Sequence, residues 1–87
     1  MKLSIYSLKN ILFQGEASLL NCQTMAGEIT VLDKHEALIG VLTAGVIKIL
    51  VKNPSAGSGL EKEQFFPVKS GFLEVKPDNE VRCIVEQ

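Results

Sequence analysis

The stretch that decides the fold is Phe72-Leu73-Glu74-Val75-Lys76-Pro77-Asp78-Asn79-Glu80-Val81-Arg82-Cys83-Ile84-Val85. Residues 72–76 have the composition of a short strand, and the Pro-Asp-Asn that follows is typical of a tight turn. After the turn, apolar residues recur at every second position, which is the pattern of a strand that buries one face. The stretch therefore predicts two strands joined by a tight turn.

The same signals recur toward the start of the chain. Leu3 and Ile5 alternate with polar neighbours, and Leu20 and Cys22 continue the pattern further on. No stretch has a convincing helical period, and turn residues recur every few positions. The sequence therefore predicts an all-β protein, a small antiparallel β-sandwich or flattened barrel of about eight to ten short strands. A chain of 87 residues supports one such domain, spanning residues 1–87.

The middle of the chain predicts a long hairpin. Strands are expected at residues 46–52 and 60–68, with a Gly- and Ser-rich hairpin loop between them at 53–59. Pro67 has no N–H to donate, so it belongs on an edge strand or at a bulge. Gly15, earlier in the chain, suggests a bulge or a close backbone approach.

Composition and charge exclude several classes of function. Nine Lys and Arg side chains are interspersed with ten Asp and Glu, whereas nucleic-acid binding relies on concentrated basic side chains. We therefore expect no nucleic-acid partner. No apolar run approaches the roughly 20 residues that span a bilayer, and the first residues lack the apolar core of a signal peptide. We expect a protein that stays on the cytosolic side without inserting into the membrane.

Residues that commonly carry enzyme chemistry are sparse. His35 is the single imidazole and lies on an expected turn, where a surface or interface role is more common than a general base. Cys22 and Cys83 form no Cys-x-x-Cys motif. We favour two buried thiols acting as small hydrophobes, with a disulfide or metal pair as the alternative. No catalytic, cofactor or metal site is expected, and no enzyme activity.

Two stretches are apolar at both odd and even positions. Residues 38–42 and 46–51 would therefore present apolar side chains on both faces of their strands. One face belongs to the core. The other is covered either by neighbouring loops or by a partner.

Four blocks of the sequence resemble the epsilon subunit of F-type ATP synthases. Residues 5–17 match the opening of that family, where an apolar strand, a polar turn and a Leu-Phe-x-Gly-Glu-Val segment follow one another. Residues 27–39 match its Gly-Glu-Phe-Gly-Ile-Leu-Pro-Gly-His-Ala-Pro-Leu-Ile segment without gaps. Residues 44–49 match a Pro-Gly-Val-Val-Arg-Ile strand entry, and residues 70–75 match Gly-Gly-Phe-Leu-Glu-Val.

The resemblance implies a non-catalytic central-stalk subunit of a rotary ATP synthase, with no cofactor of its own. Its partners would be the gamma subunit and the c-ring, which it would fasten together so that ion-driven rotation reaches the catalytic head. It would lie peripherally on the cytoplasmic face of the inner membrane. That family continues into a two-helix C-terminal hairpin, and this sequence reaches to Gln87, about where the hairpin begins. A free-standing β-sandwich adaptor that binds through an edge strand is the alternative function.

By position, the resemblance also suggests roles for single residues. Gly27 and Glu28 would lie in a loop that faces the c-ring. The residues expected to face gamma are Ser7, His35, Ile39 and Leu42. The alternatives are a solvated turn carboxylate for Glu28 and ordinary core positions for Ile39 and Leu42. Asp33-Lys34 stands where the family has Pro-Gly, so the corner before His35 lacks the proline that fixes φ.

Overall fold

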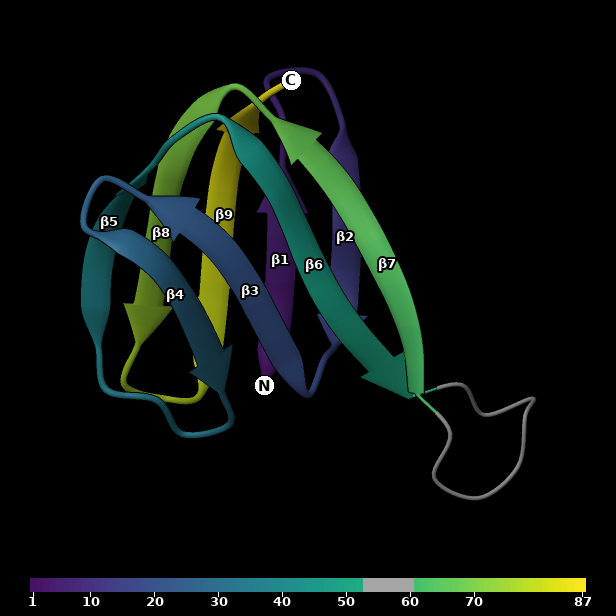
Figure 1. Cartoon of the computed structure of the whole chain (residues 1–87). Helices are drawn as coiled ribbons and strands as arrows, with labels where there is room; N and C mark the ends of the chain where they lie inside the picture. The colour runs from purple at the N-terminus through teal and green to yellow at the C-terminus, as the bar shows by residue number, and fades with distance from the viewer. Residues whose placement is uncertain (53–60) are drawn as a thin grey trace.

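The computed structural model describes residues 1–52 and 61–87, and every regular element in them is a strand (Figure 1). The strands are β1 (Lys2–Tyr6), β2 (Ile11–Glu16), β3 (Leu19–Thr24), β4 (Gly27–Leu32), β5 (Leu38–Leu42), β6 (Gly45–Lys52), β7 (Glu61–Val68), β8 (Ser70–Lys76) and β9 (Glu80–Glu86). These nine short strands confirm the all-β prediction. All pairs are antiparallel except β1 with β9, which run parallel.

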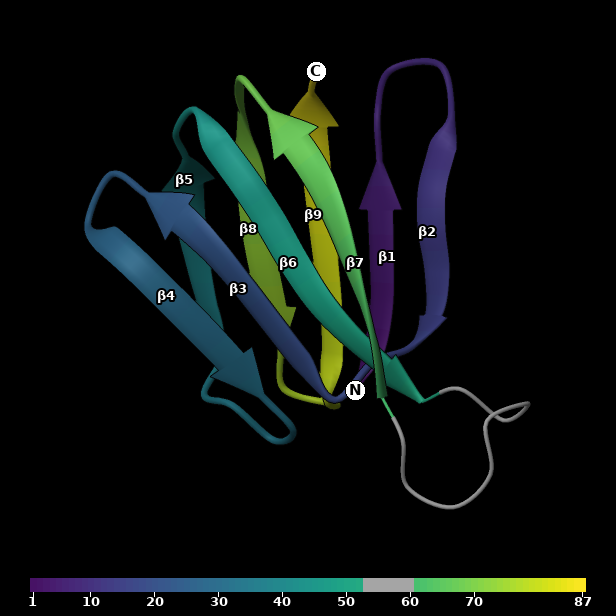
Figure 2. The same cartoon turned by 45° about the vertical axis from the view of Figure 1, so that its right-hand side comes forward.

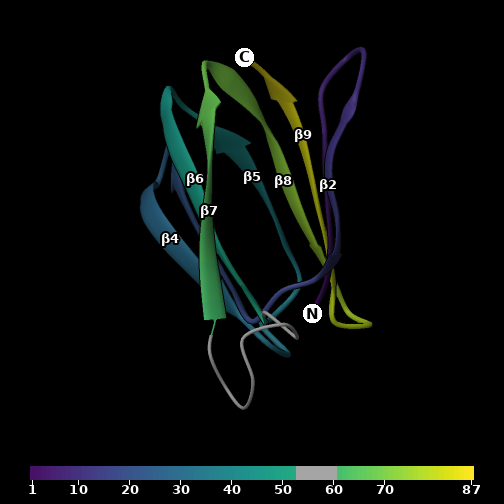
Figure 3. The same ribbon diagram turned by 90° about the vertical axis from the view of Figure 1, so that its right-hand side faces the viewer.

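The strands form one continuous sheet that folds over on itself. The hydrogen-bonded order is β2-β1-β9-β8-β5-β3-β6-β7, and β4 adds to the free side of β3. The sheet folds where β5 meets β3, which are paired through Thr24 and Leu42. Strands β2, β1, β9, β8 and β5 make a first layer, and β4, β3, β6 and β7 make a second (Figures 2 and 3).

The predicted strand–turn–strand stretch is the β8–β9 hairpin, which pairs Phe72 with Ile84 and Val75 with Val81. Asn79 in its turn has a φ of 59°, a left-handed conformation that Asn tolerates better than most residues. At the other end of β8, a Cβ on Gly71 would come within 2.3 Å of the Ile84 carbonyl oxygen. Only glycine fits this close approach of the two strands.

Two backbone expectations have different outcomes. Pro67 lies on β7, at the edge of the sheet, as predicted. Gly15 is not at a bulge, because it pairs regularly with Leu3. The register shift between β1 and β2 lies instead where Tyr6 pairs with Ile11. The hairpin loop predicted at 53–59 lies outside the described residues.

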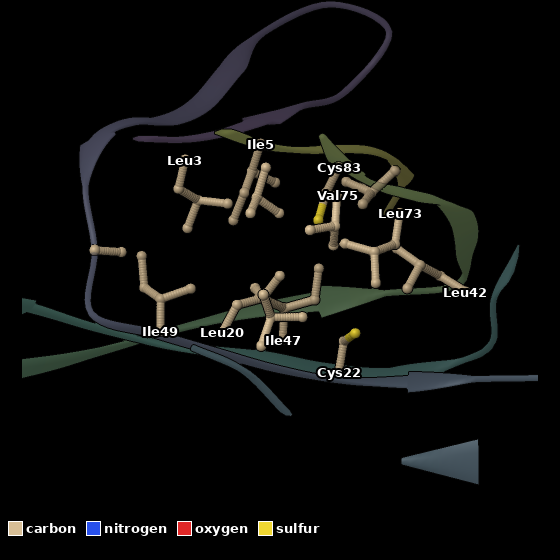
Figure 4. Packing of buried hydrophobic residues seen from close by; sticks show 14 of the residues in the cluster. Leu3, Ile5, Leu20, Cys22, Leu42, Ile47, Ile49, Leu73, Val75 and Cys83 are labelled. Atoms are coloured by element: carbon tan, nitrogen blue, oxygen red, sulfur yellow. The ribbon is translucent and has the colours of Figure 1, made fainter. Parts of the chain in front are cut away.

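The core fills the space between the two layers. Its side chains come from alternate positions of facing strands, such as Leu3 and Ile5 in the first layer and Leu20 in the second (Figure 4). All three are fully buried, and burying one such side chain contributes about 1.5–3 kcal/mol. Where the edges β2 and β7 approach each other, Phe13 packs on Phe66 with the ring centroids 6.5 Å apart.

Cys22 on β3 and Cys83 on β9 are free thiols that enter the core from opposite layers. Packed sheets lie about 10 Å apart, whereas a disulfide requires Cα atoms within about 7 Å. Burial raises the pKa of Cys22 to about 11. Burial, with a smaller contribution from Cys22, raises the pKa of Cys83 to about 12. The expectation of two buried thiols is confirmed.

We predict that these thiols react slowly with a disulfide reagent in the native protein. At pH 8 a thiol with a pKa of about 11 is only about 0.1% thiolate, the reactive form. Labelling by Ellman's reagent should be at least about a hundredfold slower in buffer than in 6 M guanidinium. Rapid labelling of the native protein, or an internal disulfide on non-reducing electrophoresis, would contradict this.

Candidate functional site

A row of apolar side chains crosses the outer face of the first layer. Its members lie directly opposite one another on neighbouring strands: Val41, Phe72, Ile84, Tyr6 and Ile11. Phe72 is 58% exposed and Ile11 61%. With strands about 4.8 Å apart, this apolar row is about 19 Å long. Five apolar residues in register on a solvent-facing sheet are unusual, because that face is normally polar.

A hollow of about 260 Å³ opens beside the part of the apolar row that Val41, Phe72 and Ile84 form, on the side of the neighbouring Ser70–Glu86 pair. Phe72 and Ile84 line it, with Val41 on β5 and Leu8 in the β1–β2 turn. Its remaining lining residues are Ser70, Gly71, Val85 and Glu86. Leu8 is 91% exposed, so it adds apolar surface next to the row.

The outer face of the first layer becomes charged away from this row. In the next register row, Ile39 lies opposite Glu74, and Glu74 lies opposite Arg82. One row further, Lys76 forms an ion pair with Glu80 at 3.3 Å. The apolar surface is therefore confined to one end of the face.

The outer face of the second layer is of mixed polarity. Thr30, Asn21, Lys48 and Phe65 form one register row across its four strands. The Asn21 amide donates to Thr30 Oγ1 at 3.0 Å, and Lys48 pairs with Glu63 at 3.8 Å. Apolar residues flank this row on both sides, with Val46 paired to Pro67 in one neighbouring row and Leu32, Leu19 and Leu50 aligned in the other, so polar side chains divide the apolar surface of this face. The two outer faces differ in chemistry.

The two β5 residues predicted to face gamma lie on opposite sides of the strand. Ile39 is 78% exposed on the outer face, whereas Leu42 is 2% exposed and belongs to the core. Residues three apart in a strand point to opposite faces. The placement of Leu42 on an outer face is therefore wrong, and Val41 takes that position.

Ser7 and His35 lie at opposite ends of the first layer. Ser7 follows Tyr6, which is level with Ile84, and its hydroxyl accepts from Asn10 N at 3.1 Å to close the β1–β2 turn. His35 follows Lys34, whose N–H donates to Asn79 in the β8–β9 turn, next to Glu80. Four residues of β9 separate the two levels, which is about 13 Å. The structure does not bring Ser7 and His35 together.

Gly27 and Glu28 are the first two residues of β4, immediately after the β3–β4 turn, rather than loop residues. Gly27 has a φ of 111°, which favours glycine. The Glu28 carboxylate accepts a hydrogen bond from the Asn21 amide at 3.1 Å, so it lies along the outer face of the second layer. Because Thr24 pairs with Leu42, this turn lies at the same end as Leu8 and the hollow.

Hydrogen bonds hold the corner before His35. Lys34 has a φ of 62°, and its N–H donates to Asn79 Oδ1 at 2.7 Å. The N-terminal ammonium and the Asn79 amide both donate to Asp33. These contacts, the ammonium first, hold the pKa of Asp33 below its ordinary value. Any stability that Asp33 contributes is therefore present at neutral pH and lost as the pH falls through that lowered pKa.

Within residues 1–52 and 61–87, no three His, Cys, Asp or Glu side chains gather in a way that could hold a metal ion. The same residues include no helix long and apolar enough to cross a membrane. His35 Nδ1 lies 2.8 Å from the carbonyl oxygen of Glu36 and so is engaged by its neighbour.

Sequence reasoning missed most of the apolar row. The available signal was the apolar residue next to each core residue, as in Phe72-Leu73 and Cys83-Ile84. The sequence does not show that these apolar residues form one surface, because that depends on the cross-strand register, which aligns Phe72 with Ile84.

Comparison with known proteins gives a consistent result. A family model described as "ATP synthase, Delta/Epsilon chain, beta-sandwich domain" matches residues 1–87. The chain is 35% identical over 77 residues to the ATP synthase epsilon chain of Hydrogenovibrio crunogenus, covering 88% of this chain and 48% of that one. It is 30% identical over 78 residues to the epsilon chain of Neisseria meningitidis, covering 90% and 51%. The chain thus spans about half the length of the curated relatives it matches.

Solved structures share the fold. A chain of the Euglena gracilis mitochondrial ATP synthase, in a structure of its OSCP, F1 and c-ring, superposes with a TM-score of 0.83 at 18% identity. The match covers all of this chain and 51% of that one. A chain from the central stalk and c-ring of the Tetrahymena thermophila enzyme gives 0.78 at 19% identity, covering 100% and 63%.

Because Asn79 holds the corner before His35, we predict that its substitution lowers the stability of the protein. Asn79→Ala removes the hydrogen bond to Lys34 N and places alanine in a left-handed conformation. The free energy of unfolding should therefore fall by about 2 kcal/mol. Asn79→Gly keeps the backbone freedom and loses only the hydrogen bonds, so it should cost about 1 kcal/mol. Urea denaturation measures both.

The matched control is Asp78→Ala in the same turn, which should change stability by less than about 0.5 kcal/mol. If Asn79→Gly is as stable as the parent, the side-chain hydrogen bonds of Asn79 do not hold this corner.

Proposed function

The chain belongs to the ATP synthase delta/epsilon family through its β-sandwich domain, and on that premise we propose that it is a central-stalk subunit fastening gamma to the c-ring. In this role it helps to couple ion-driven rotation to ATP synthesis, while catalysis lies on other subunits. It would be held peripherally at the cytoplasmic face of the inner membrane through these partners.

The observation that carries the proposal is the chemical difference between the two outer faces. The apolar row lies across five neighbouring strands of the first layer, whereas the aligned run of Leu32, Leu19 and Leu50 on the second layer crosses three strands and ends at Glu63. A docking surface needs a compact apolar centre, because a few central residues supply most of the binding energy. We assign the apolar row, with Leu8 and Ile39 beside it, to the contact with gamma.

The contact with the ring is assigned to the end of the sandwich that carries the β3–β4 turn. Met25 in that turn is 76% exposed, and Gly27 and Glu28 follow it. The β1–β2 turn, with Leu8, lies at the same end. An end surface and an adjoining face let one small domain hold two partners at once. Ser7 lies at this end beside Leu8, so it keeps its proposed place next to the gamma contact. His35 lies at the other end of the first layer and would contact gamma where gamma extends along its full height.

The alternative, an adaptor that binds through an edge strand, has one observation in its favour. Strand β4 pairs with β3 on one side and with no other described strand. Edge strands can pair with an extended peptide. Such binding would depend on the β4 backbone and would not depend on the apolar row, so one set of variants distinguishes the two functions.

We predict that Ile39→Asp weakens binding to purified gamma by at least about a hundredfold. Burying an unpaired carboxylate in the interface costs several kcal/mol, and each 1.4 kcal/mol is a factor of ten in affinity. The fold should be retained, because Ile39 is 78% exposed. Isothermal titration with gamma and a thermal melt measure the two effects.

Val46→Asp is the matched control, since Val46 is half exposed on the outer face of the second layer. It should bind gamma within about threefold of the parent. Equal binding by the parent and Ile39→Asp would show that gamma docks elsewhere. Failure of the parent to co-purify with gamma would remove the stalk proposal itself.

A further inference from the structure

We propose that the hollow lined by Phe72 and Ile84 receives a single apolar side chain of gamma, and that Glu86 at its rim pairs with a Lys or Arg next to that side chain. This inference rests on the proposed function and adds the chemistry of the partner segment.

The hollow has a structural cause in β8. Its first residues, Ser70 and Gly71, are small, and Gly71 cannot be larger because a Cβ would strike the Ile84 carbonyl oxygen at 2.3 Å. The neighbouring Phe72 and Ile84 are large and outward-facing. A depression therefore forms where β8 begins, beside the small side chain of Ser70.

The volume indicates what the hollow can hold. About 260 Å³ is below the roughly 300–1,000 Å³ of sites for cofactors and other small molecules. It corresponds to some eight or nine waters at about 30 Å³ each, which is enough for one large side chain. The side chains of Leu8, Val41, Phe72 and Ile84 make the lining mainly apolar. An aliphatic or aromatic side chain fits this environment.

The charge of the hollow indicates what stands beside that side chain. Glu86 is the one charged residue among those that line it, and it is exposed. Among the described residues, the Glu86 carboxylate accepts one long hydrogen bond, from Ser70 Oγ at 3.5 Å. A carboxylate at the edge of an apolar contact is stabilised by a cation from the partner, which also speeds association. The favoured partner segment therefore has an apolar residue with a basic neighbour.

Charge also argues against a second copy of this chain as the occupant. Two copies joined symmetrically through the hollow would bring two Glu86 carboxylates into one interface. Like charges across an interface disfavour association.

The test uses two variants of the full chain with purified gamma. Ser70→Trp places a large ring at the rim and should fill the hollow, lowering gamma affinity at least about tenfold. Glu86→Lys reverses the rim charge and should lower affinity about tenfold at 50 mM salt. That difference should shrink at 1 M salt, where charges are screened beyond about 3 Å. Asp78→Lys, the same charge change at the opposite end of the first layer, should have little effect.

Loss of affinity in Ser70→Trp and a salt-dependent loss in Glu86→Lys, with unchanged thermal melts, support the proposal. If Ser70→Trp binds like the parent, the hollow receives nothing. If Glu86→Lys binds gamma like the parent at 50 mM salt, Glu86 does not pair with a basic residue of gamma. If Ile39→Asp loses gamma while both new variants bind normally, this inference fails and the stalk function stands. If the parent chain forms dimers and Ser70→Trp dissociates them, the occupant of the hollow is a second copy of this chain, and the inference is overturned.

Discussion

The packing of side chains between the two layers is the interaction on which the rest of the structure depends. Leu73 and Val75 from β8 belong to the same buried cluster as Ile47 from β6. Among the described residues, every buried side-chain N or O atom has a hydrogen-bond partner. Because strands alternate their faces, these inward positions fix which residues face outward. The apolar row is outward because the core positions beside it are inward. Shifting β8 by one residue would bury Phe72 and expose Leu73.

The β8–β9 hairpin was predictable from the sequence because all its determinants are local. The Pro-Asp-Asn turn and the alternation after it act within 14 residues. Which side chains of residues 38–42 face the core was harder to predict, because both sets of alternate positions are apolar and either could be buried. Even so, Ile39 and Leu42 are three residues apart, so a strand cannot place both on one face. The apolar row depends on pairings between strands as distant as β1 and β9, which no local pattern contains.

The corner before His35 shows how one local device can replace another. The resemblance places Pro-Gly where this chain has Asp33-Lys34, and Lys34 adopts the positive φ that a glycine at that position would allow. The rigidity comes instead from Asn79, which lies 45 residues further along the chain and bonds to Lys34 N. Sequence alone could identify the missing proline, but the replacement required the fold to bring the β8–β9 turn beside the corner.

The fold in the sheet at β5 and β3 has a mechanical consequence. The backbone bonds there, Met25 N to Val41 O and Thr43 N to Gln23 O, flank the single Thr24–Leu42 pair. On the opposite side, β2 and β7 meet through Phe13 and Phe66 rather than through a described strand pairing. The two layers are thus hydrogen-bonded to each other along one edge, and elsewhere they are joined by apolar contact and by short chain connections, Ala17-Ser18 between β2 and β3 and Lys69 between β7 and β8. A torque applied to one layer is therefore transmitted to the other through the core side chains, the hydrogen-bonded edge and these short connections together.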